Sequence, residues 1–60
     1  MKLKFYSEDG VYIGCAVWND GVVADTSIIF DEADWDQIEL DLENGLNDGH
    51  LPDGTIWEVE

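Results

Sequence analysis

The segment Val11–Trp18 reads VYIGCAVW and is rich in β-branched and aromatic residues. Such residues favour the extended backbone of a β-strand. Asp9-Gly10 precedes the segment and Asp20-Gly21 follows it, and both dipeptides favour the tight turns of β-hairpins. Val11–Trp18 is therefore expected to be the middle strand of an antiparallel meander, flanked by strands at Leu3–Tyr6 and at Val22 to about Ser27.

The pattern changes from strand-like to helical after this meander. Within Asp31–Asn44 (DEADWDQIELDLEN), apolar residues recur at spacings of three and four, namely Trp35, Ile38 and Leu42. This spacing predicts a helix with one apolar face. Asp31 is suited to cap its N-terminus, and Gly45 is placed where a glycine ends a helix.

The last part of the chain predicts a loop and one more strand. Asn47–Gly54 is rich in turn-forming Asn, Asp, Gly and Pro, whereas Thr55–Val59 places Trp57 and Val59 on one face. A length of 60 residues allows one domain, residues 1–60. The expected fold class is α+β in the order β-β-β-α-β, with the helix packed on one face of the sheet.

The central strand should present two different faces. One face is expected to pack on the core and carries Val11, Ile13, Cys15 and Val17. Tyr12 and Trp18 share the other face, which a single helix cannot also cover. This second face is either ordinary half-exposed surface or an aromatic patch, and the Tyr12/Trp18 face is then a candidate homodimer interface.

The charge of the chain limits the kinds of partner that it can bind directly. It contains 15 acidic and 2 basic residues, with a formal net charge of -13, and both cations are lysines, Lys2 and Lys4. Without a basic patch, direct binding to nucleic acid or to an anionic membrane is not expected. A hydrophobic fraction of 45% and three tryptophans argue against disorder.

Other general features indicate a cytoplasmic protein. Cys15 is the only cysteine, so an internal disulfide is excluded. No apolar segment has the length of a signal peptide or of a membrane span.

Seven acidic residues lie in or next to the expected helix, and no cation balances them: Asp31, Glu32, Asp34, Asp36, Glu39, Asp41 and Glu43. Like charges three or four residues apart meet on a helix surface and cost about 0.2–0.5 kcal/mol per pair. The run contains four such pairs, Glu32/Asp36, Glu39/Glu43, Asp31/Asp34 and Asp36/Glu39. A chain that needed only solubility would mix lysine with glutamate. A solvated polar face and adaptation to high salt are the alternatives to a functional explanation.

The functional hypothesis is mimicry of nucleic acid. Carboxylates on successive helical turns lie about 5–6 Å apart and can imitate a row of phosphates, which proteins contact through Lys and Arg. All seven acidic residues are therefore predicted to bind a partner, namely a basic nucleic-acid-binding protein. Trp35 and Ile38 are expected to anchor the helix on the sheet.

The chain resembles the small acidic DNA-mimic inhibitors of phages and mobile elements, which include anti-CRISPR proteins, anti-restriction proteins and uracil-DNA glycosylase inhibitors. The resemblance rests on the size of the chain and on the run Asp31–Glu43. It concerns a class and not a motif, so no contact residues carry over. It implies blockade of a basic DNA-binding site on a host defence or repair protein.

A second binding function depends on the same electrostatic attraction. An antitoxin or immunity protein that neutralises a basic nuclease toxin would also present an acidic surface to a basic site. The order of elements is loosely similar to small antitoxin domains of the HicB type.

Metal binding and catalysis have little support in the sequence. The segment that begins at Asp34 has Ile38 where an EF-hand needs an oxygen ligand, and it lacks the required glycine. Zinc needs three or four ligands, whereas Cys15 and His50 are the only soft ones. A cysteine in mid-strand is usually an inert apolar residue, so neither it nor Ser27 is expected to act as a nucleophile. No enzymatic activity, metal or cofactor is expected.

Overall fold

The computed structural model describes residues 1–60 and contains one helix and five strands. The elements are β1 (Lys2–Tyr6), β2 (Tyr12–Asn19), β3 (Val22–Thr26), α1 (Glu32–Glu43), β4 (Asp48–His50) and β5 (Ile56–Val59). All strands are antiparallel to their neighbours, in the order β3-β2-β1-β5-β4. The expected α+β fold with one helix on the sheet is confirmed.

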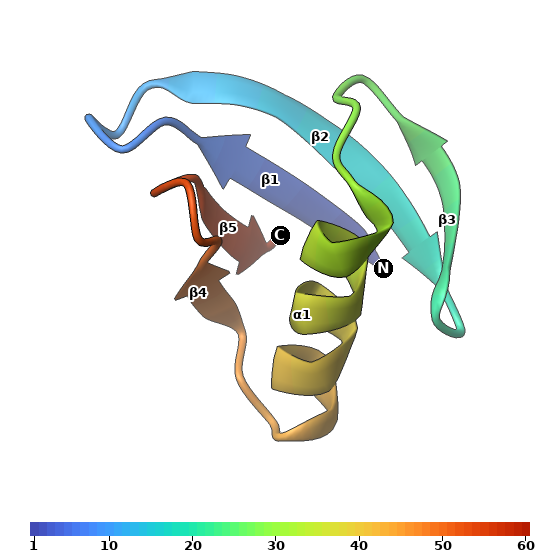
Figure 1. Cartoon of the computed structure of the whole chain (residues 1–60). Coiled ribbons are helices and arrows are strands. Elements are labelled where there is room, and N and C mark those ends of the chain that lie inside the picture. Colours follow the sequence, from blue (N-terminus) through green and yellow to red (C-terminus); the bar gives the residue numbers. More distant parts are fainter.

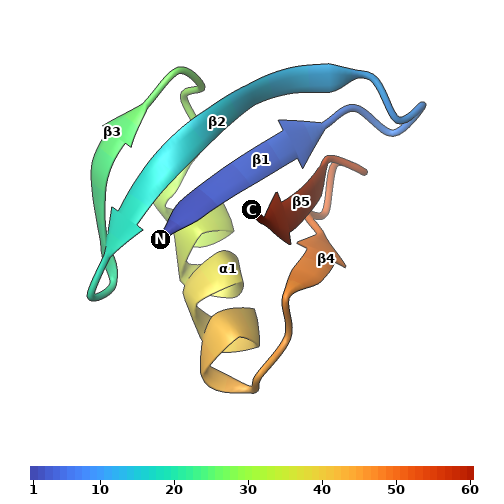
Figure 2. The same cartoon turned by 180° about the vertical axis from the view of Figure 1, so that it is seen from behind.

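The sheet curls around the helix and leaves its other face open. Strands β1 and β2 arch over α1, which lies on the concave side of the sheet (Figure 1). From behind, no element covers the convex side (Figure 2). The buried residues lie between sheet and helix and include four large side chains with no exposed surface, Leu3, Phe5, Ile38 and Trp57. No helix is long and apolar enough to cross a membrane.

The expected core face of β2 is wrong. The inward residues of this strand are Gly14, Ala16 and Trp18, whereas Val11 and Ile13 are exposed. Pairing with β1 explains the difference, because it places Phe5 opposite Gly14 and Leu3 opposite Ala16. The space above Gly14 is taken by Ser27 and Ile28, because a Cβ at position 14 would lie 2.6 Å from atoms of both. Alternation in the sequence separates the two faces but does not say which one faces the helix.

Tyr12 and Trp18 do not form one exposed patch. The register shifts between Phe5 and Tyr6, so Tyr12 lies opposite Tyr6 and their rings are 5.8 Å apart. Tyr12 is 54% exposed, whereas Trp18 is 5% exposed and its ring centroid lies 5.9 Å from that of Trp35. The bulge therefore separates two aromatic residues that strict alternation would have placed together.

The segment expected to be a loop contains the short strand β4, which pairs with β5. Gly49 lies opposite Trp57, and a Cβ at position 49 would stand 2.8 Å from the indole Nε1. The large ring thus requires a glycine in the neighbouring strand. Tripeptide Asp48-Gly49-His50 has low strand propensity, which is why the sequence indicates a turn there.

The predicted helix ends agree closely with the structure. Asp31 occupies the N-cap with an extended backbone, although its side chain makes no capping hydrogen bond. Gly45 follows the last turn with φ +83°, a conformation that favours glycine.

Candidate functional site: the acidic flank of the helix

The acidic residues of α1 divide between two flanks. Successive residues of a helix are rotated by about 100°, and the buried Ile38 marks the side that faces the sheet. One flank carries a row at spacings of four, three and four residues, Glu32, Asp36, Glu39 and Glu43. We call this row the acidic flank. Asp34 and Asp41 lie on the opposite flank, and the outward face between the two carries Ala33, Gln37 and Leu40.

The structure therefore brings together four of the seven predicted residues. Asp31 precedes the helix as its N-cap and is exposed. Asp34 and Asp41 are half-buried, and Gln37 Nε2 donates a hydrogen bond of 3.1 Å to Asp41 Oδ1. The row on the acidic flank spans about 16 Å along the helix axis.

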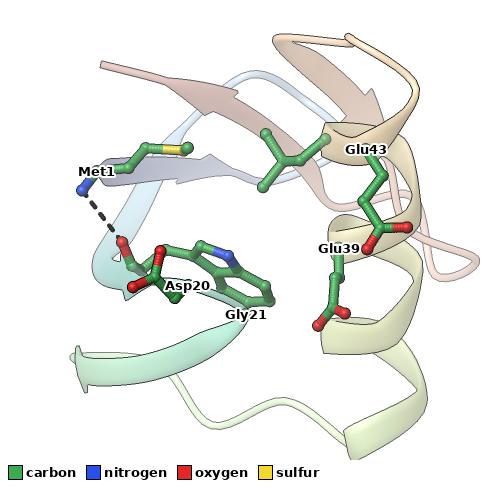
Figure 3. Close-up of a pocket in the computed structure, with 7 residues that line it drawn as sticks. Met1, Asp20, Gly21, Glu39 and Glu43 are labelled. Carbon is green, nitrogen blue, oxygen red and sulfur yellow. Dashed lines mark hydrogen bonds between the residues drawn. The ribbon is translucent and has the colours of Figure 1, made fainter.

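The turn between β2 and β3 extends this surface. Its residues Asp20 and Gly21 both have positive φ, +50° and +81°. A Cβ at Gly21 would lie 3.1 Å from Glu39 Oε2, so the glycine allows the carboxylate to approach the turn closely. Asp20, Glu39 and Glu43 line one open pocket of about 310 Å³ (Figure 3).

Asp20 is a site residue that the sequence did not indicate. It is distant from the acidic run in the chain, and its Asp-Gly dipeptide is explained by the hairpin alone. The sequence alone is enough to divide the acidic residues of the helix between two flanks, because spacings of four, three and four residues place side chains along one stripe of a helix.

No cation lies in a salt bridge with the acidic flank. Lys2 and Lys4 alternate with the buried Leu3 and Phe5, so both lysines project from the convex face of the sheet. Lys2 Nζ is 3.6 Å from Glu60 Oε2, and this exposed pair is the only salt bridge in the structure. No lysine therefore offsets the repulsion within the acidic flank.

The convex face holds the groups with raised pKa values. Tyr6 Oη donates a hydrogen bond of 2.9 Å to Glu58 Oε1, which raises the pKa of Tyr6. A hydrogen bond with the Cys15 side chain raises the pKa of Tyr12. Both tyrosines therefore stay protonated well into the alkaline range, and neither contributes charge at neutral pH.

The structure does not bring together the soft and nucleophilic residues. Cys15 lies in β2 and His50 in β4, and two strands separate these in the sheet. Ser27 Oγ accepts a hydrogen bond from the Cys15 N–H at 3.0 Å and donates one to the Cys15 carbonyl at 3.2 Å, so it extends the strand pairing. No group of three or more His, Cys, Asp or Glu side chains has the arrangement of a metal site.

The structure thus offers a charged surface as its most distinctive feature. Comparison with known proteins gives no family for this surface, because no family model, no curated protein and no solved structure matches the chain.

Proposed function

We propose that this protein is an inhibitor that mimics DNA. The acidic flank, with Asp20 beside it, occupies the basic nucleic-acid-binding groove of a host defence or DNA-processing protein, for example a CRISPR effector. The observation that carries the proposal is the uncompensated row of four carboxylates on one flank of α1. The proposed place of action is the cytoplasm, where such partners meet DNA.

The row has the properties that mimicry requires. Its carboxylates are fixed by a helix whose apolar side packs against the sheet through Ile38, with Trp35 and Leu42 beside it. A preorganised row loses less conformational entropy on binding than a disordered acidic segment would. Contact with Lys and Arg also relieves the repulsion within the row. The repulsion between carboxylates that destabilises the free helix is thus removed in the complex.

The proposed function is tested by competition with DNA. A basic protein captured from host lysate is purified, and displacement of its labelled duplex DNA by this chain is measured at low and at moderate salt. Displacement is expected at low salt and should weaken steeply as salt rises.

Two double variants make the test specific for the acidic flank. Glu32→Gln/Asp36→Asn removes two charges from the acidic flank, and Asp34→Asn/Asp41→Asn removes two from the opposite flank. We expect the first to weaken displacement about tenfold or more and the second to change it little. Equal losses, or no displacement of DNA from any captured protein, would contradict the proposal.

A further inference from the structure

Strand β4 (Asp48–His50) is a short edge strand that is bonded to the sheet on one side only. It lies outside β5 at one end of the sheet, after the connection from α1 (Figure 1). Val59 N–H donates a hydrogen bond of 2.8 Å to the Asn47 carbonyl, and the bonds of an antiparallel pair fall on alternate residues. Gly49 and Trp57 are therefore the bonded pair within the strand. A single residue of β4 thus carries its hydrogen bonds to β5.

The closed position of β4 leaves one polar group without a partner. Trp57 has no exposed surface, and its indole Nε1 is the only buried side-chain nitrogen or oxygen that makes no hydrogen bond. A Cβ at Gly49 would stand 2.8 Å from this atom, so the indole N–H lies directly against β4. A buried donor that is left unpaired destabilises the state that buries it, because in water the same group would be hydrogen-bonded. Movement of β4 away from the ring would remove this penalty.

The side chains of β4 and β5 add a repulsive contact. Asp48 lies directly opposite Glu58 in the register of the two strands. Like charges that face each other on neighbouring strands are destabilising. No salt bridge joins either carboxylate to a cation, and Glu58 instead accepts the hydrogen bond from Tyr6 Oη. This contact is independent of the indole and has the same consequence, since it also disfavours the closed position of β4.

We propose that β4 is a flap, which separates from β5 while α1 and the rest of the sheet stay folded. In the open position the indole N–H of Trp57 meets water, and Asp48 moves away from Glu58. The large core side chains of the other elements keep their places, because none of them belongs to β4. Strand β5 then becomes the edge of the sheet and presents a free row of backbone donors and acceptors. This inference does not rest on the proposed function.

The residues on either side of β4 limit the opening to a short segment. Leu51 follows the strand directly and is 3% exposed, so it anchors the chain in the core. Before the strand, Leu46 N–H donates a hydrogen bond of 3.0 Å to the Asp41 carbonyl in the last turn of α1. The flap is therefore residues 47–50. Local opening is expected where few buried apolar side chains hold a segment, and both Asp48 and His50 are exposed.

Native-state hydrogen exchange tests the flap in the intact protein. Amide exchange of ¹⁵N-labelled protein is followed by NMR in increasing, non-denaturing concentrations of urea. We expect the Gly49 amide, corrected for its intrinsic rate, to exchange about tenfold or more faster than the amides of β1, which is paired on both sides. Its exchange should also depend little on urea, because a local opening exposes little surface. Equal protection and equal urea dependence in β4 and β1 would mean that β4 opens only when the whole protein unfolds, and would overturn the inference.

A replacement that lacks the N–H tests the role of the indole. A chain of 60 residues can be made by chemical synthesis, with ¹⁵N-glycine at position 49 and β-(3-benzothienyl)alanine in place of Trp57. This residue keeps the shape of the ring and has sulfur where the indole has N–H. We expect exchange of the Gly49 amide to slow about tenfold, since opening no longer allows an unpaired donor to meet water. The same replacement at the half-buried Trp35 is the control and should change exchange at Gly49 little. An unchanged rate after replacement of Trp57 would show that the opening does not uncover the indole, which would contradict the proposal.

A charge reversal at Asp48 gives a second test that uses only natural residues. Asp48→Lys turns the repulsion with Glu58 into attraction and should slow exchange of the Gly49 amide about threefold or more, after correction for its intrinsic rate. The control Asp25→Lys makes the same change in net charge on β3, the strand at the other edge of the sheet, and should not slow it. Similar slowing in both variants would assign the effect to net charge. That result, or no slowing with Asp48→Lys, would count against the flap.

Discussion

At the scale of single residues, two glycines make room for bulky side chains. Gly14 and Gly49 both lie where an added Cβ would come within 3 Å of a neighbouring side chain, Ile28 in one case and Trp57 in the other. In the sequence, Gly14 is a break in an otherwise good strand pattern and Gly49 is part of a turn-rich segment. Only the packed structure shows that each lies against a bulky side chain, which is a reason for its presence in a strand.

Asp53 is the one carboxylate whose pKa is clearly changed. The backbone N–H of Thr55 donates a hydrogen bond of 2.8 Å to Asp53 Oδ1, which lowers the pKa of Asp53 below its ordinary value. Folding thus favours the charged form of Asp53. The stability that this carboxylate contributes is present above the pKa that Asp53 has in the unfolded chain. That contribution is lost as pH falls through the lower pKa of the folded state.

We therefore expect Asp53→Asn to destabilise the protein at neutral pH and to have a smaller effect in acid. The measurement is urea unfolding of both proteins between about pH 7 and about pH 3, because the difference should shrink below about pH 4. Thr55→Ala keeps the backbone N–H but removes the side-chain hydroxyl, which also lowers the pKa of Asp53, so it should weaken the pH dependence without abolishing it. A difference in stability that stays constant with pH would contradict this account.

At the scale of elements, local pattern predicted most of the structure and failed where packing decides. The three strands before the helix, the helix itself and the last strand follow from residue type and spacing. The inward face of β2 could not be known, because that depends on how Leu3 and Phe5 of β1 pair with it. Strand β4 could not be known either, because Gly49 pairs there beside the ring of Trp57.

The candidate site was predictable to a similar degree. The charge run points to α1, and four of its carboxylates share one flank of that helix. It did not distinguish these from Asp34 and Asp41 on the other flank. It also missed Asp20, because only the tertiary structure brings the β2–β3 turn beside Glu39.

The last turn of α1 provides a direct test of the repulsion within the acidic flank. This turn contains no basic residue, although cations are favoured at a helix C-terminus. Glu43→Lys removes the repulsion with Glu39 and creates an attractive pair in the favoured order, acid before base. We expect a gain in the free energy of unfolding of about 0.5–1.5 kcal/mol at low salt.

Urea denaturation at low and high salt measures this gain, which should shrink as salt screens the charges. The control is Glu8→Lys, which makes the same charge change in the turn between β1 and β2. A similar gain in that variant would mean that the net charge of the molecule, and not the helix, is responsible.

At the scale of the whole molecule, the two lysines and the acidic flank lie on opposite sides of the sheet. Both lysines project from the convex face, together with Tyr6 and Tyr12. The acidic flank lies on the other side of the sheet with the helix (Figure 1). A cationic partner would therefore meet the helix side of the molecule. The convex face would remain outside the complex.

Salt is expected to have opposite effects on folding and on binding. The screening length falls from about 30 Å at 0.01 M salt to about 10 Å at 0.1 M, so repulsion within the acidic flank should weaken over that range. We expect the protein to be folded in dilute buffer, because its core of Leu3, Phe5, Ile38 and Trp57 is complete without any cation. Its melting temperature should rise with added salt and level off well below molar concentrations.

Binding to a basic partner should change in the other direction, because salt weakens attraction between the two surfaces as it relieves repulsion within one. Melting curves and displacement of DNA are measured in the same series of salt concentrations. Adaptation to high salt predicts instead that folding requires molar salt and that no partner binds at any concentration. A protein unfolded in dilute buffer would therefore favour salt adaptation. A rising melting temperature together with falling affinity is the result expected if the acidic flank is tolerated in the free protein and neutralised in a complex.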